Sequence, residues 1–87
     1  KWTRKAAKQG FADAQFYLGA MYATGEGVMK SGAAAADWFY KAGLSYLKEG
    51  KRDEALHCVE VIKNLPKYGL TVPNLFLADK LMSRIYK

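Results

Sequence analysis

His57 and Cys58 are the one neighbouring pair in the sequence that could supply a base and a nucleophile. Such a pair works only when the two side chains face each other across a hydrogen bond. Within a helix, successive side chains point about 100° apart, so these two cannot act on one another. We therefore predict a partly exposed histidine beside a buried cysteine that serves as a small core residue.

A metal site would need the single histidine and the single cysteine to be joined by carboxylates such as Glu54 and Glu60. These four residues do not have the ligand spacing of a zinc site. The sequence therefore predicts no metal and no cofactor.

No segment has the pattern of a catalytic or nucleotide-binding motif. Gly25-x-Gly27 lacks the third glycine and the preceding strand of a dinucleotide loop, and no Gly-Lys-Ser/Thr follows it. Asp53 and Glu54 fall at an expected helix start, where carboxylates complement the helix dipole. None of the serines sits in a nucleophile motif: they are Ser31, Ser45 and Ser83. We predict that the chain is not an enzyme.

The net charge of +6 over 87 residues is concentrated at the two ends of the chain. Residues 1–10 carry +4 and residues 64–87 carry +3, which leaves −1 on residues 11–63. A continuous basic stripe is the usual signature of nucleic-acid binding, so the distribution makes nucleic acid an unlikely partner. The single cysteine excludes an intramolecular disulfide, and no apolar run approaches the roughly 20 residues of a membrane span.

Hydrophobic spacing predicts five helices and no strand. Gly10 should end the first helix, Ser31 should cap the third, and Pro66 should prevent smooth continuation of the fourth. Pro73 suits the first turn of the fifth helix, after a loop over residues 68–72. The expected helices span residues 1–9, 12–24, 32–49, from about 51 or 53 to 65, and from 73 onward.

Two short motifs each occur twice in the chain, which indicates an internal repeat. Trp2-x-x-Lys5-Ala6 returns as Trp38-x-x-Lys41-Ala42 at an offset of 36, within the range of helix-pair solenoids. Gly19-x-x-Tyr22 returns as Gly43-x-x-Tyr46 at an offset of only 24. Because the offsets disagree, the chain is not two clean copies of one unit. We expect it to be a segment of a longer helical array.

Residues 1–42 carry motifs specific enough to indicate a family. The stretch Ala12-Asp13-Ala14-Gln15-Phe16-Tyr17-Leu18-Gly19-Ala20-Met21-Tyr22, followed by Gly25-Glu26-Gly27-Val28 and Ala35-x-x-Trp38-Phe39-x-Lys41-Ala42, resembles a Sel-1-like repeat, a relative of the tetratricopeptide repeat. Residues 1–10 resemble the close of a preceding repeat. In this pattern Gly19 would let a neighbouring helix approach closely, since it has no Cβ.

The resemblance implies a right-handed α-α superhelix of antiparallel helix hairpins. Residues 11–49 would form one Sel-1-like hairpin. The usual connector is missing after Ala42, so the third helix should continue to about Lys48. Residues 50–87 would form a divergent terminal hairpin whose last helix has a polar outer face, made of Lys80, Ser83, Arg84 and Lys87.

In related repeat proteins the first helix of each pair lines a concave binding surface. Carried over by position, the resemblance implies a protein or peptide partner held by Asp13, Phe16, Tyr17 and Ala20. The third helix would add Tyr40, Lys41, Leu44 and Lys48.

Three alternatives to partner binding stay open from the sequence. The basic termini could bind nucleic acid or another acidic partner. Some cysteine-rich relatives are associated with β-lactam binding or hydrolysis, but their cysteine pairs are absent here. A purely structural end cap is the third alternative.

Overall fold

The structure, a computed structural model, describes the backbone of residues 2–86 and the side chains of residues 5–86. The side chain of Trp2, with the charges of Lys1, Arg4 and Lys87, lies outside the described residues. Residues 2–86 are all-helical and contain no strand, as predicted. The helices are α1 (Trp2–Lys8), α2 (Ala12–Thr24), α3 (Gly32–Lys48), α4 (Arg52–Asn64), the short 3-10 helix η1 (Leu65–Tyr68) and α5 (Phe76–Ile85).

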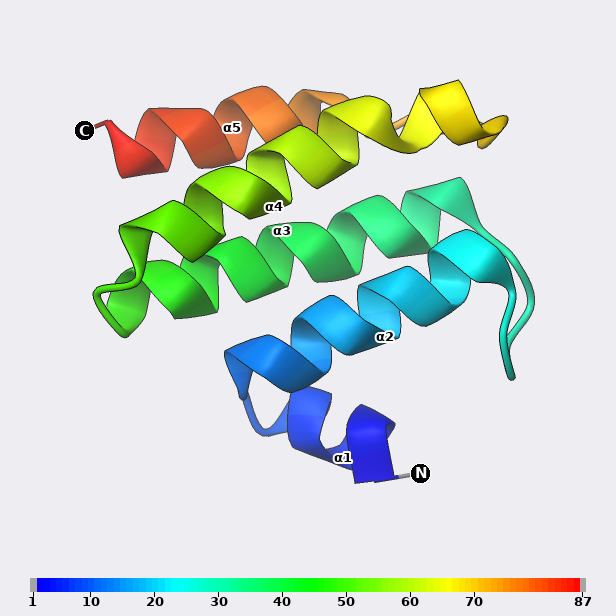
Figure 1. Ribbon diagram of the computed structural model, residues 1–87, viewed down its shortest axis with the longest axis horizontal. Helices are drawn as coiled ribbons and strands as arrows, with labels where there is room; N and C mark the ends of the chain where they lie inside the picture. The colour runs from blue at the N-terminus through cyan, green and yellow to red at the C-terminus, as the bar shows by residue number, and fades with distance from the viewer. Residues whose placement is uncertain (1, 87) are drawn as a thin grey trace.

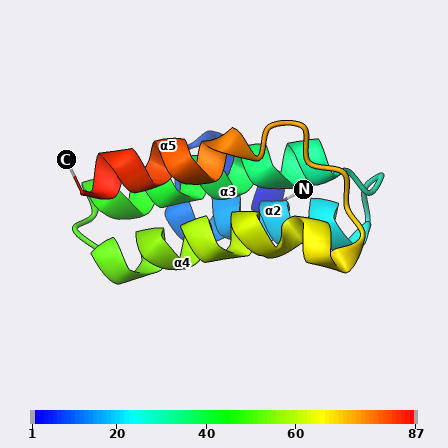
Figure 2. The same ribbon diagram turned by 90° about the horizontal axis from the view of Figure 1, so that it is seen from above.

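Consecutive α-helices run in opposite directions and pack side by side, as Figure 1 shows. Viewed from above, α2 and α4 form one layer while α3 and α5 form the other (Figure 2). The chain therefore builds a flat molecule with extents of 34 × 28 × 15 Å. Because α2 and α4 are two steps apart in this alternation, they run in the same direction.

Helix ends follow the predicted turn and capping residues. Gly10 and Gly25 adopt left-handed conformations, with φ of 89° and 78°, within two residues of the ends of α1 and α2. Such φ values are easily reached only by glycine. The Ser31 hydroxyl accepts a 3.1 Å hydrogen bond from the Ala34 N–H and so caps α3. As expected, α3 continues without a break to Lys48.

The segment between α4 and α5 differs from the prediction. As predicted, α4 does not continue through Pro66, but the chain first forms the 3-10 helix η1 from Leu65, and α5 starts at Phe76 rather than at Pro73. The Asn74 side-chain amide donates a 3.0 Å hydrogen bond to the Ala33 carbonyl, which ties this segment to the start of α3. The Leu77 N–H bonds three residues back to the Asn74 carbonyl, so residues 73–75 form a turn and the regular helix begins at Phe76.

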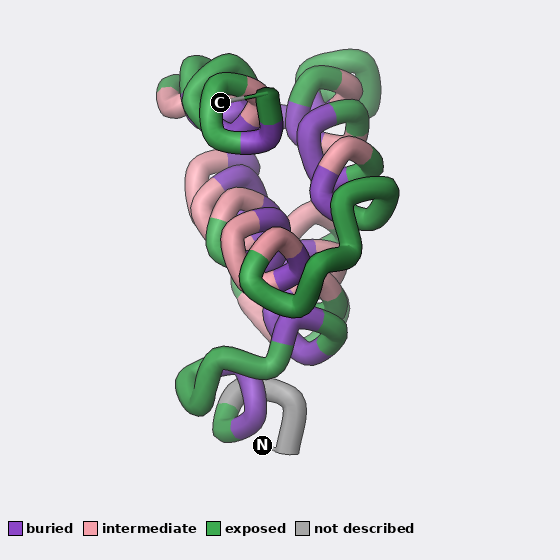
Figure 3. The backbone as a smooth tube through the Cα atoms, turned by 90° about the vertical axis from the view of Figure 1, so that its left-hand side faces the viewer, coloured by how far each residue is buried: buried purple, intermediate pink, exposed green. Residues whose placement is uncertain are grey.

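Most buried side chains form one core between the two layers (Figure 3, purple). Its largest fully buried members are contributed by α3, α4 and α5: Phe39, Val59, Ile62 and Leu81. A smaller cluster joins α1 to α2 through Ala6, Ala7, Ala14 and Leu18, with the half-buried Trp38 packed against it.

Two glycines allow the close helix packing that the sequence predicted for Gly19. A Cβ at Gly19 would lie 2.9 Å from the Phe39 ring, closer than side-chain atoms normally approach. Gly43 has the same role on α3, because a Cβ there would overlap the methyl groups of Leu81 on α5. Each glycine thus accepts a large side chain from a neighbouring helix.

The predicted polar face of the last helix is found where the structure describes it, since Lys80, Ser83 and Arg84 are exposed. Among the helices of residues 2–86, none combines the length and the apolar character needed to cross a membrane.

Candidate functional site

A largely apolar groove of about 550 Å³ lies between α2 and α4. Its lining comes from α2, α3, α4, η1 and the two loops beside them, and we call it the α2–α4 groove. The residues that line it are Phe16, Ala20, Ala23, Thr24, Lys30, Phe39, Val61, Leu65, Tyr68 and Leu70.

Phe16 is the central aromatic side chain of the α2–α4 groove. Its ring packs edge-to-face on Phe39 with centroids 5.0 Å apart, and it stacks on His57 of α4 with centroids 5.7 Å apart. Aromatic pairs in these geometries add about 0.5–1.5 kcal/mol to the free energy gained by burial. The half-buried Phe16 ring is therefore held at the junction of three helices while part of it stays open to solvent.

The charge of the α2–α4 groove lies at the end where both helices finish. Lys30 and Tyr68 line this end, and Tyr68 is 73% exposed. Asp13 and Glu54, in the first turns of α2 and α4, are not part of the lining. The groove is thus apolar with one basic end.

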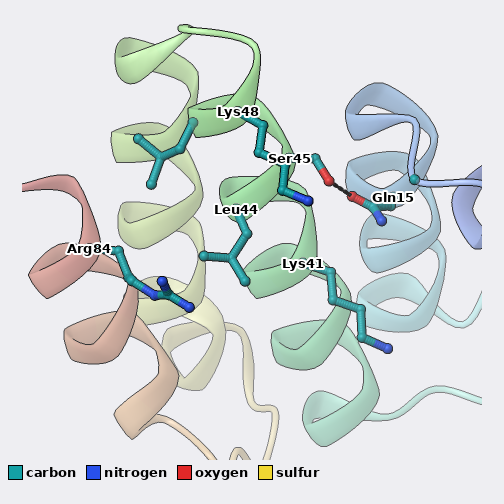
Figure 4. Close-up of a pocket in the computed structure, with 8 residues that line it drawn as sticks. Gln15, Lys41, Leu44, Ser45, Lys48 and Arg84 are labelled. Carbon is teal, nitrogen blue, oxygen red and sulfur yellow. Dashed lines mark hydrogen bonds between the residues drawn. The ribbon is translucent and has the colours of Figure 1, made fainter.

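A second cavity, of about 610 Å³, opens on α3 between α2 and α5 (Figure 4). We call it the α3–α5 cavity. It shares no lining residue with the α2–α4 groove, and it is lined by Gly10, Gln15, Lys41, Leu44, Ser45, Leu47, Lys48 and Arg84.

Three cations surround the α3–α5 cavity. Lys41 forms an exposed ion pair with Asp37 at 3.4 Å, and its ammonium lies 4.5 Å from the centroid of the Trp38 ring. Neither Lys48 nor Arg84 has a carboxylate within ion-pair distance among the side chains of residues 5–86.

Gln15 forms a polar wall of the cavity. It was not among the functional residues predicted from the sequence. It is 7% exposed; its amide donates to the Ala7 carbonyl at 3.2 Å, and its carbonyl accepts from the Ser45 hydroxyl at 2.6 Å. One side chain thereby joins α1, α2 and α3. The available signal was a glutamine three residues before Leu18, on the apolar face of α2.

Cys58 and Tyr46 are buried titratable groups with shifted pKa values. Burial, with the charge of Glu54 as a smaller cause, raises the pKa of the Cys58 thiol to about 12. The thiol is therefore protonated and unreactive at neutral pH. Burial also raises the pKa of the Tyr46 phenol, which donates a 2.6 Å hydrogen bond to the Asp13 carboxylate. His57 is exposed beside the buried Cys58, as predicted.

The residues predicted to bind a partner do not form one surface. Phe16 and Ala20 line the α2–α4 groove, whereas Lys41, Leu44 and Lys48 line the α3–α5 cavity.

The other three predicted residues line neither hollow. Asp13 accepts the Tyr46 hydrogen bond, and Tyr17 is 59% exposed. Tyr40 is half-buried, with the Lys80 ammonium 5.9 Å from its ring centroid.

Within the described part of the chain, no three histidine, cysteine or carboxylate side chains gather where they could hold a metal ion. Comparison with known proteins finds no matching family model, no matching curated protein and no matching solved structure.

Proposed function

We propose that this chain is a Sel-1-like helical-repeat module that binds a protein or peptide partner and has no catalytic activity of its own. In this proposal the helices belong to a right-handed superhelix in which α2 and α3 form the Sel-1-like hairpin. Helices α4 and α5 form the divergent hairpin that follows it. The motifs of residues 1–42 and the alternating antiparallel helices support the assignment.

The α2–α4 groove is the observation that carries the proposal. It is lined by the first helix of each proposed pair, which is where the resemblance implies a concave binding face. Its walls are apolar, and partly exposed aromatic rings stand within it or at its edge. Interface cores are enriched in aromatic side chains of this kind.

The site favours an extended or helical peptide over a small molecule. Lys30 is the one charged residue among the described residues that line the groove, so no set of charged groups converges on one point. Apolar side chains of a bound peptide would pack against Phe16 and Val61, and Ala20 leaves the space that they enter.

A peptide-display selection on the immobilised chain tests the proposal. We expect selected peptides to carry an apolar anchor and to shift the amide resonances of Phe16, Ala20 and Ala23. Ala20→Arg, which fills the groove, should weaken binding roughly tenfold or more, as the loss of an interface hot spot does. Ser83→Arg introduces the same side chain at an exposed position of α5 and should leave binding unchanged.

Circular dichroism of both variants would establish that each remains folded. The proposal is rejected if no peptide exceeds background, or if the two arginine variants weaken binding equally.

A further inference from the structure

The α3–α5 cavity has a chemistry that the α2–α4 groove lacks. Lys48 projects from α3 and Arg84 from α5 on either side of Leu44, as Figure 4 shows. Lys41 is two helical turns before Lys48 on the same face of α3, and its ammonium extends away from Leu44 toward Asp37 and Trp38. Positive charge from two helices therefore borders an aliphatic centre.

The basic surface continues beyond the cavity along the α3–α5 contact. Lys80 lies one turn before Arg84 on α5, and its ammonium stands over the Tyr40 ring of α3 at 5.9 Å. Arg84 and Lys48 come from parts of the sequence that are 36 residues apart and meet only in the fold. Because neither has an acidic partner among residues 5–86, both can pair with a ligand without first breaking an ion pair.

The floor of the cavity is aliphatic. Leu44 and Leu47 are half-buried, and both line the space between the cations. A simple anion would satisfy the rim and leave this floor exposed. A ligand that matches the whole site combines negative charge with an apolar group.

A protein segment fits this pattern better than a nucleic acid does. Single-stranded nucleic acids bind through aromatic side chains on which their bases stack, in addition to cations along the backbone. No aromatic side chain lines the cavity among the residues that the structure describes. Glutamate or aspartate on either side of a leucine supplies both the charge and the apolar group.

We propose that the α3–α5 cavity is a second docking site, which binds an acidic segment of a partner protein. An apolar side chain of that segment packs on the leucine floor, and the flanking carboxylates pair with Lys48 and Arg84. Lys41 contributes by exchanging its exposed pair with Asp37, since such pairs stabilise by only about 0–1 kcal/mol.

The probe for this site is a short fluorescent peptide with a Glu-Leu-Glu core, titrated into the whole chain and followed by anisotropy. We expect saturable binding that weakens as salt increases, because exposed ion pairs are screened. A peptide with glutamine in place of both glutamates, and another with serine in place of leucine, should each bind more weakly.

Two double variants of equal charge locate the site. Lys48→Gln with Arg84→Gln should weaken binding of the probe roughly tenfold, as expected for the loss of two partly exposed ion pairs. Lys63→Gln with Lys67→Gln removes two exposed cations that line neither hollow, and it should leave affinity within about twofold.

Three results would overturn this proposal: no binding of the probe, equal losses in the two double variants, or tighter binding of a single-stranded oligonucleotide than of the peptide. Ala20→Arg separates the two sites, because it blocks the groove and should leave binding of the acidic probe intact.

Discussion

Side-chain hydrogen bonds join α1, α2 and α3, whereas α4 and α5 pack on α3 chiefly through apolar side chains. In the first region, Gln15 links α2 to both neighbours, and Tyr46 of α3 donates to Asp13 of α2. In the second region, the contacts centre on Leu81, Val59 and Ile62. Both regions nevertheless use a glycine to bring helices close, Gly19 in one and Gly43 in the other.

The comparison shows how the two types of contact specify packing. A buried hydrogen bond fixes the register of two helices because a displaced partner leaves a polar group unsatisfied. Apolar contacts fix the register of two helices through complementary shape. Here the Leu81 side chain of α5 packs against the space left by Gly43 on α3. The region that resembles a known repeat has polar links between its helices, whereas α4 and α5 pack on α3 mainly through shape, with the Asn74–Ala33 hydrogen bond in the segment before α5.

The largest expected effect comes from Leu81→Ala in the apolar region. Leu81 is fully buried, so truncation should lower the free energy of unfolding by about 3 kcal/mol. Gly43→Ala alone should destabilise through its clash with Leu81, by about 1–3 kcal/mol less the helix propensity gained. Urea unfolding monitored by circular dichroism measures both variants.

The double variant tests the contact between Gly43 and Leu81 directly. With Leu81 truncated, Gly43→Ala meets no methyl group and should become neutral or stabilising. Additive effects of the two substitutions would contradict the contact.

The next largest effect is expected in the polar region. Gln15→Leu leaves the Ala7 carbonyl and the Ser45 hydroxyl without their partner and should cost about 2 kcal/mol in the same assay. Gln9→Leu makes the same chemical change at an exposed position and should be close to neutral. Equal losses in the two variants would show that the hydrogen bonds contribute nothing specific.

The last effect is confined to alkaline pH and is a loss of stability that involves both regions. The Cys58 thiol has a pKa of about 12 in the folded protein, against an ordinary 9.0, so the unfolded chain releases this proton first. The free energy of unfolding is then unaffected below about pH 9 and should fall between pH 9 and 12, by up to about 1.4 kcal/mol per pH unit.

Tyr46, whose pKa is also raised, adds to this loss above pH 10. Denaturant titrations at neutral and alkaline pH measure the slope. Cys58→Ala should reduce it from pH 9 upward, and Tyr46→Phe should reduce it only above pH 10. Unchanged slopes in both variants would be inconsistent with these shifts.

The helix boundaries were predictable where a local residue sets them. Gly10, Gly25 and Ser31 act within one turn of their own position, so the first three helices begin and end near the predicted residues. The start of α5 was predicted too early, at Pro73; the segment before it is tied to α3 by the hydrogen bond from Asn74 to Ala33, 41 residues away in sequence, which no local pattern indicates.

The candidate sites were predictable only in part. Phe16 and Ala20 follow from their position on α2, and both line the groove. The positions on α3 were predicted as part of the same surface, but Lys41 and Lys48 line a different cavity. Phe39 of α3 lines the groove and not the cavity, so α3 contributes to both surfaces. Arg84 joins Lys48 only after α5 folds back beside α3, and the hairpin predicted for residues 50–87 did not by itself place α5 there.

The shared direction of α2 and α4 has a consequence for any chain lying between them. Parallel helix dipoles add, so both helices impose a field of the same direction along the groove, which lies toward their two C-termini. Lys30 lines this end and is opposite in sign to the partial negative charge of the C-termini. A peptide would therefore meet a different electrostatic field in each of its two possible directions along the groove. The groove would then distinguish the chain direction of a bound peptide as well as its side chains.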